Sequence, residues 1–160
     1  MRRKDKQTDV GFALELLENC EYATLSTTNP DGSPYAVPVS IALEGQAAYF
    51  HCALLGKKLD NIAQNPQVCL NCVGRTRLLP QDFSTEFESA VAIGRARLVH
   101  DEHEKIHALR LICLKYAPGN MQAFDGEIAK MLARTGVVKI ELESITGKAT
   151  KKPKTSQSED

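Results

Sequence analysis

Two adjacent lysines, Lys57 and Lys58, occupy the first turn of a short helix that the sequence predicts over Leu59–Gln64, with Gly56 opening it. Cations at this end face the positive pole of the helix dipole, at a cost of roughly a few tenths of a kcal/mol. A bound anion would reverse that cost, because backbone N–H groups at a helix N-terminus bind phosphate and lysine ammonium groups add charge. The glycine spacing of a Walker A loop is missing. A solvated lysine pair at a frayed helix end and a phosphate site both fit this pattern.

Polar side chains near the lysines favour the phosphate site. His51 lies on a predicted strand that leads directly into the lysine pair, and Thr24, Ser26 and Thr27 place hydroxyl groups on an earlier strand. A hydrogen-bonded strand histidine and the ordinary β-propensity of threonine are the structural alternatives. Hydroxyls, backbone groups and a cationic helix end together suit a phosphorylated, partly polar planar cofactor.

The sequence "HEKIH", His103 to His107, formally matches the zinc-peptidase motif HExxH, with Glu127 as a conceivable third ligand. The helical spacing argues against this zinc-dependent hydrolase. The apolar stripe of the predicted helix contains Ile106, Leu109, Ile112, Cys113 and Tyr116. Both histidines lie far from the centre of this stripe, toward solvent. We therefore expect no metal ligands.

Cysteine usage predicts no disulfide framework. Cys69 and Cys72 have CxxC spacing, but on a strand this separation sends the two side chains to opposite faces. We predict that both are small buried apolar residues, as are Cys20 and Cys113 on helix faces. Five cysteines without framework spacing fit a reducing compartment, and we expect a cytoplasmic protein.

Composition indicates an ordinary globular domain. The 160 residues are 42% hydrophobic and 25% charged, and the formal net charge is zero, which argues against binding of nucleic acid through bulk electrostatics. The chain shows neither an apolar run of about 18 residues nor a secretory signal, so no membrane association is expected. We predict one domain over residues 1–150 and a disordered polar tail over 151–160.

The candidate residues lie among predicted strands with few helices between them. A helix capped by Thr8 or Asp9 precedes a hairpin that turns at Asn29-Pro-Asp-Gly. Further strands are predicted over 47–53, 67–80, 87–100 (bent at Gly94) and 137–145, and the hairpin strands over 22–27 and 35–43, with Pro38 marking an edge. Helices are predicted over 101–117 and 121–136. This order predicts an antiparallel barrel with helices packed outside.

These motifs in this order resemble the pyridoxamine 5′-phosphate oxidase-like, FMN-binding split-barrel family, and within it the 5-nitroimidazole-resistance (Nim) group. The resemblance covers about residues 1–145 and is strongest over 22–74. It implies a six-stranded antiparallel split β-barrel with outer helices. It also implies a homodimer with two FMN sites at the subunit interface.

The resemblance assigns flavin contacts to specific positions. These are Thr24, Leu25, Ser26 and Thr27 along the flavin, Val39 and Ser40 at its ring, His51, Cys52 and Ala53 leading to the phosphate, Lys57 and Lys58 on the phosphate, and Ser89 closing the site or contributed by the partner subunit. His51 is the residue implied to act on substrate. Many relatives have Gly or Ser at the position of Cys52, so the local geometry there departs from the family pattern.

The implied activity is that of a flavin-dependent oxidoreductase acting on a small molecule, with a nitroaromatic such as a 5-nitroimidazole as one candidate. NAD(P)H would dock transiently as a donor, because the chain contains no GxGxxG dinucleotide fingerprint. A non-enzymatic flavin- or haem-binding module is the alternative, since some relatives bind haem or a deazaflavin in place of FMN and His51 is a possible haem ligand.

Overall fold

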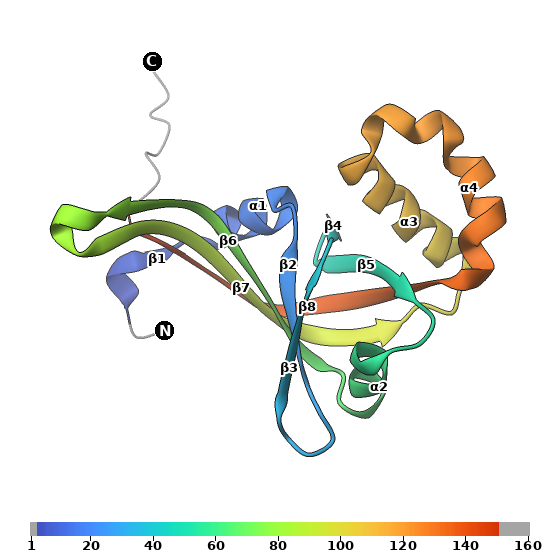
Figure 1. Cartoon of the computed structure of the whole chain (residues 1–160), viewed down its shortest axis with the longest axis horizontal. Helices are drawn as coiled ribbons and strands as arrows, with labels where there is room; N and C mark the ends of the chain where they lie inside the picture. Colours follow the sequence, from blue (N-terminus) through green and yellow to red (C-terminus); the bar gives the residue numbers. More distant parts are fainter. Residues whose placement is uncertain (1–2, 151–160) are drawn as a thin grey trace.

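The computed structural model describes residues 3–150 and contains one antiparallel sheet of eight strands, flanked by four α-helices (Figure 1). The strand order is β3-β2-β6-β7-β8-β5-β4, and the short β1 also pairs with β8. The strands are β1 Gln7–Thr8, β2 Ala23–Thr28, β3 Pro34–Val39, β4 Ala42–Glu44, β5 Ala47–Ala53, β6 Gln67–Leu79, β7 Ser84–Leu98 and β8 Thr135–Ala149. The helices are α1 Val10–Asn19, α2 Lys57–Gln64, α3 Glu102–Tyr116 and α4 Phe124–Met131.

The sheet curls around an apolar core but does not close. Side chains from β2, β5, β6 and β8 meet inside it, among them Leu25, Phe50, Leu70 and Ile140, all fully buried. Within residues 3–150, β3 and β4 end the ladder without pairing to each other. The predicted antiparallel split barrel is therefore confirmed, with six longer strands and the two short additions β1 and β4.

The predicted strand over 35–43 is in fact two strands, because the chain turns away between Val39 and Ala42. At this break the Ile41 carbonyl accepts hydrogen bonds from Lys115 Nζ and Tyr116 Oη of α3, each 2.8 Å long. These side-chain donors replace a ladder partner, so the strand ends here. The edge position predicted from Pro38 is correct, since β3 is the first strand of the sheet.

The bend predicted at Gly94 is also confirmed. The register between β7 and β8 shifts between Ile93 and Gly94. A Cβ atom at Gly94 would lie 2.2 Å from the carbonyl oxygen of Glu141, so only glycine allows the two backbones this close approach.

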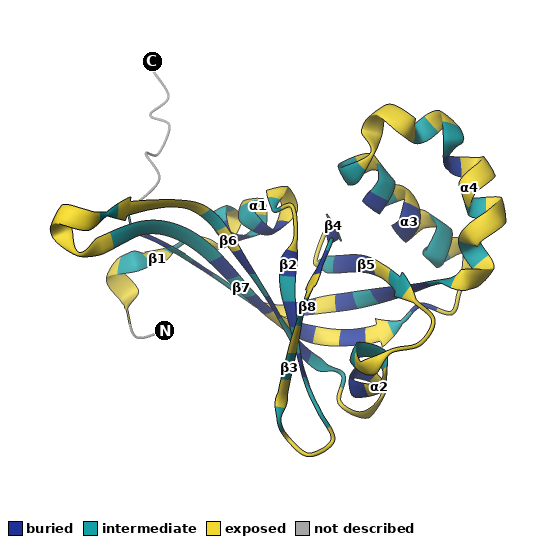
Figure 2. Ribbon diagram, in the orientation of Figure 1, coloured by how far each residue is buried: buried dark blue, intermediate teal, exposed yellow. Residues whose placement is uncertain are grey.

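A second apolar layer covers the outer face of β5 and β8. Helices α3 and α4 contribute Leu109, Ile112 and Phe124, which pack with Tyr49 and Val137 of the sheet. Figure 2 shows buried positions where α3 faces the strands and exposed positions on its far side. The histidines of HEKIH are on the exposed side, as the spacing predicted.

The helix predicted over 121–136 is shorter than expected. Turns of 3-10 type over Pro118–Ala123 and Leu132–Arg134 flank α4. The helix stops because Thr135 begins β8 and pairs with Ala53, while its hydroxyl donates to the Met131 carbonyl at 2.9 Å. Across the described residues, no helix is long and apolar enough to cross a membrane. The predicted tail over 151–160 lies outside them.

Candidate functional site

The lysine pair lies where the sequence placed it, in the first turn of α2, directly after β5. Gly56 caps this helix with φ +143° and ψ 158°, a conformation open to glycine and strained for other residues. Lys57 is exposed and Lys58 is half-buried. The first amide groups of a helix have no acceptor within it, so this turn presents N–H groups together with two ammonium groups.

A buried amide fixes this helix to the sheet. Asn61 is 1% exposed, and its Nδ2 donates to Thr27 Oγ1 and to Asn29 Oδ1, both at 2.9 Å. The Thr27 hydroxyl in turn donates to the Tyr35 carbonyl at 3.3 Å. Sequence reasoning missed Asn61, although a polar residue beside Ile62 on the buried side of a short helix was a usable signal. The Thr27 hydroxyl therefore holds α2 in position.

The two lysines point to different neighbours. Lys57 Nζ lies 5.1 Å from the centroid of the Tyr35 ring on β3. Hydrogen bonds from Ser33, helped by the charge of Lys57, lower the pKa of Asp31 in the β2–β3 turn. Lys58 acts on Cys52, where burial raises the pKa of the thiol and the lysine charge partly opposes that shift. The pair thus spans the end of β5 and the β2–β3 hairpin.

Strand alternation divides the predicted residues of β2. Leu25 and Thr27 point into the core, whereas Thr24 and Ser26 are half-buried on the opposite face. Ser89 lies on that same face, and the register continues it across β6 and β7. We call it the outer-sheet face; it comprises Thr24, Ser26, Cys69, Asn71, Val73, Ser89, Val91 and Ile93. Val73 and Ile93 are 60% and 43% exposed, so this face presents apolar surface.

The residues predicted at the flavin ring lie at the end of β3. Val39 is buried, and half-buried Ser40 joins it in an open depression of about 510 Å³, completed by Tyr22 and Pro38. Next to Ser40, the Ile41 carbonyl accepts the 2.8 Å hydrogen bond from the Tyr116 hydroxyl, and burial of the phenol raises the pKa of Tyr116.

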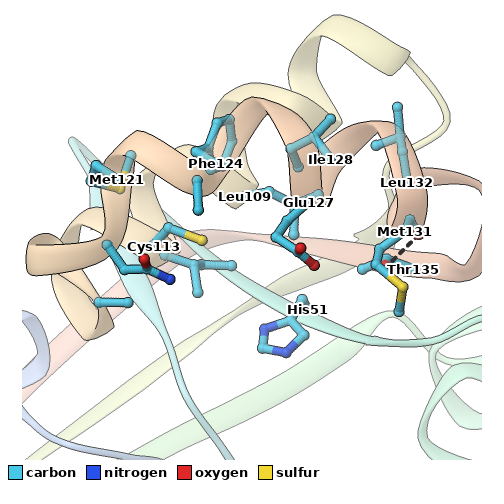
Figure 3. Close-up of a pocket in the computed structure, with 14 residues that line it drawn as sticks. His51, Leu109, Cys113, Met121, Phe124, Glu127, Ile128, Met131, Leu132 and Thr135 are labelled. Carbon is cyan, nitrogen blue, oxygen red and sulfur yellow. Dashed lines mark hydrogen bonds between the residues drawn. The ribbon is translucent and has the colours of Figure 1, made fainter.

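His51 lies apart from the lysines and hydroxyls, because successive strand residues face opposite ways. Its ring is at the wall of a cavity of about 220 Å³ between β5 and the α3–α4 layer (Figure 3). Most of the lining is apolar, including Leu109, Ile112, Cys113, Met121, Phe124, Ile128, Met131 and Leu132. The carboxylate of Glu127 points toward His51 across this cavity (Figure 3). An apolar cavity of about 150 Å³ already holds benzene, so a small aromatic ring fits here.

Sequence reasoning did not predict this cavity, since Glu127 was considered only as a third zinc ligand. His107 of the HEKIH motif instead contacts Glu44 of β4, with Nε2 and Oε1 2.8 Å apart. Among the described residues there is no group of three or more His, Cys, Asp or Glu side chains that could hold a metal ion.

The chain was compared with known proteins at the level of sequence and of structure. A family model described as pyridoxamine 5′-phosphate oxidase matches residues 9–149. None of the curated protein sequences compared with the chain matches it.

Solved structures share its fold over most of their length. A candidate 5-nitroimidazole antibiotic resistance protein from Bacteroides thetaiotaomicron is 25% identical, with a TM-score of 0.72, covering 88% of this chain and 83% of that one. A flavocytochrome from Azotobacter vinelandii is 21% identical, with a TM-score of 0.80, covering 99% and 75%. An FAD and haem binding protein from Mycobacterium smegmatis is 18% identical, with a TM-score of 0.76, covering 94% and 77%. By the match over residues 9–149, the chain belongs to the pyridoxamine 5′-phosphate oxidase family.

Proposed function

We propose that this protein binds a flavin, FMN, and uses it to reduce a small molecule. The observation that carries the proposal is the α2 N-terminus, where Gly56, Lys57 and Lys58 form a cationic turn anchored to β2 by Asn61. The flavin- and haem-binding proteins of similar fold support the cofactor class.

The residues at this turn fit a phosphomonoester. A phosphate ester carries a charge of about −2, which two ammonium groups offset. The unpaired amide groups of the first helical turn add donors, as in other helix-terminal phosphate sites. Nothing lies within 4 Å of the position that a Cβ atom would take at Gly56, so an approaching anion meets no obstruction there.

The outer-sheet face would complete the site by pairing with a second copy of the chain. Thr24 and Ser26 supply hydroxyl donors there, and Val73 and Ile93 supply apolar surface that a partner subunit would bury. Ser89 of the partner subunit would then lie in the same interface. We therefore propose a homodimer that excludes water from the cofactor.

When bound, FMN would supply the one- and two-electron chemistry that the side chains lack. The His51 cavity would hold the substrate, a small planar molecule such as a nitroaromatic, with its ring against Leu109 and Phe124. A ring nitrogen of His51 would donate a hydrogen bond or a proton to the polar substituent.

The test is the absorption spectrum of the purified protein, followed by mass spectrometry of the released cofactor. We expect flavin bands and a mass equal to that of FMN. The double variant Lys57→Ala/Lys58→Ala should lose most of the bound flavin and keep its far-UV circular dichroism. Lys130→Ala/Arg134→Ala removes the same charge from exposed positions of α4 and the turn that follows it, and serves as the control. Full FMN occupancy in the lysine double variant would show that the phosphate assignment is wrong.

Haem binding is the second candidate, favoured by one observation: His51 opens onto an apolar cavity. A histidine at the edge of such a space is a common arrangement for axial ligation. A Soret band lost in His51→Ala and retained in Lys57→Ala/Lys58→Ala would support haem over FMN.

A further inference from the structure

The residues that join β3 to β4 cross the opening of the split barrel. The two strands lie at opposite ends of the sheet order, yet only Ser40 and Ile41 separate them in the chain. We call these two residues the crossing segment. The Ile41 side chain is fully buried in the barrel core. Within residues 3–150, neither residue of the crossing segment has a register partner on another strand.

Helix α3 holds the crossing segment through its last two residues. Lys115 Nζ and Tyr116 Oη each donate a 2.8 Å hydrogen bond to the Ile41 carbonyl. A carbonyl oxygen has two lone pairs, so these two donors satisfy it completely. Lys115 Nζ also lies 5.0 Å from the centroid of the Tyr116 ring, so the two side chains approach the carbonyl together.

A third side chain of α3 contacts the far end of β4. His107 Nε2 lies 2.8 Å and 3.0 Å from the two carboxylate oxygens of Glu44, the last residue of this strand. In the part of the chain that the structure describes, β4 pairs only with β5 and is three residues long. A strand this short forms few ladder hydrogen bonds, so its position depends on α3 as well as on β5.

The same helix forms one wall of the His51 cavity. Ile112 and Cys113 line this cavity, and so does Ala117, which directly follows Tyr116 in the chain. The donors that hold the crossing segment and the side chains that face the cavity therefore belong to one continuous element. The placement of α3 sets the crossing segment and the cavity relative to each other.

We propose that Lys115 and Tyr116 are positioning residues for the flavin reaction: they hold the crossing segment, and with it the ring contacts expected at Val39 and Ser40, at a fixed place relative to the substrate cavity. This inference rests on the proposed function, because the ring contacts are part of it. Neither positioning residue has to touch the flavin or the substrate. Without the two donors, the Ile41 carbonyl loses both hydrogen bonds, and the crossing segment becomes free to move at the opening of the barrel.

The experiment compares the native full chain with Tyr116→Phe, Lys115→Met and the double variant, each with and without added FMN. Without FMN, amide hydrogen exchange followed by mass spectrometry should be slow for residues 39–44 of the native chain and faster in each variant. With FMN, the Kd should rise by up to about tenfold for each hydrogen bond lost. The absorption maxima and the reduction potential of the bound flavin should shift, because the protein groups around its ring move.

Tyr116→Phe is the decisive variant, since it removes one oxygen atom and no charge. A shift of the flavin spectrum in this variant reports a change in position, whereas Lys115→Met also removes a charge. Lys105→Met is the matched control, because Lys105 of the same helix also donates to a backbone carbonyl, that of Leu132, at 2.6 Å. It should leave both the exchange of residues 39–44 and the flavin spectrum as in the native chain.

The positioning role is overturned if the native chain binds FMN and Tyr116→Phe leaves the flavin spectrum and potential unchanged, whether or not exchange becomes faster. Faster exchange alone would mean that the two donors serve stability only. Rapid exchange of residues 39–44 in the native chain overturns the inference without any variant. A native chain that takes up no FMN overturns the proposed function as well, and the spectrum of the native protein alone reveals that outcome.

Discussion

Asn61 shows how one buried amide can set the geometry of a site without touching a ligand. Its Nδ2 group donates hydrogen bonds to both Thr27 and Asn29. These bonds fix the direction in which α2 presents Lys57 and Lys58. A buried donor with two partners stabilises the fold most through the cost of leaving those partners unpaired.

We predict that Asn61→Ala destabilises the fold by about 1–3 kcal/mol, because it removes the hydrogen-bond donor of Thr27 Oγ1 and of Asn29 Oδ1. Urea denaturation followed by circular dichroism measures this. Gln64→Ala, on the exposed last turn of the same helix, should change the free energy of unfolding by less than about 0.5 kcal/mol. Equal stability of the two variants would contradict the role given to Asn61.

At the scale of elements, the β6–β7 hairpin reaches far from the barrel and ends in a strained turn. Figure 1 shows it extending away from α3 and α4. At its tip Phe83 is 99% exposed and has left-handed dihedrals, φ 46° and ψ 44°. It is the only non-glycine residue with positive φ among those that the structure describes.

We predict that Phe83→Gly raises the free energy of unfolding by about 1 kcal/mol, because glycine adopts this conformation without the Cβ clash. Thermal unfolding of the two proteins measures the difference. Phe83→Ala retains the Cβ atom and should leave the midpoint near that of the native chain. A lower midpoint for the glycine variant would indicate that the ring makes a contact in the assembled protein.

The secondary-structure elements were easier to predict from the sequence than the contacts between side chains of distant elements. Capping at Asp9, the turn at Asn29-Pro-Asp-Gly and the bend at Gly94 depend on local chemistry, so the sequence predicted them. The break at Ile41 was missed because its donors, Lys115 and Tyr116, lie more than 70 residues away. The His51–Glu127 cavity was missed for the same reason, since no local pattern indicates that distant segments will meet.

At the scale of the whole molecule, the predicted site residues do not converge within one protomer. The lysine pair, the outer-sheet face and the His51 cavity are three separate regions. A second copy covering the outer-sheet face would bring residues of two chains together, which supports the proposed homodimer.

We predict that the protein is a dimer by light scattering and that Ile93→Glu shifts it toward the monomer, because the variant would bury a charge in the interface. Flavin occupancy should fall together with the fraction of dimer in Ile93→Glu. Leu114→Glu introduces the same charge on the exposed side of α3 and should leave the dimer intact. A native chain that is monomeric at micromolar concentration would contradict both the dimer and the shared site.

The position of β8 has a consequence for the order in which the protein can be assembled during synthesis. This strand is the last one in the described chain, yet it pairs with β1, β5 and β7. Until Thr135–Ala149 has left the ribosome, β5 has only the short β4 beside it, so the strand that carries His51 cannot be stably placed. Such non-local pairing slows folding and leaves sheet edges exposed to aggregation. Nascent chains stalled before Thr135 should therefore engage chaperones, whereas chains released after Ala149 should not.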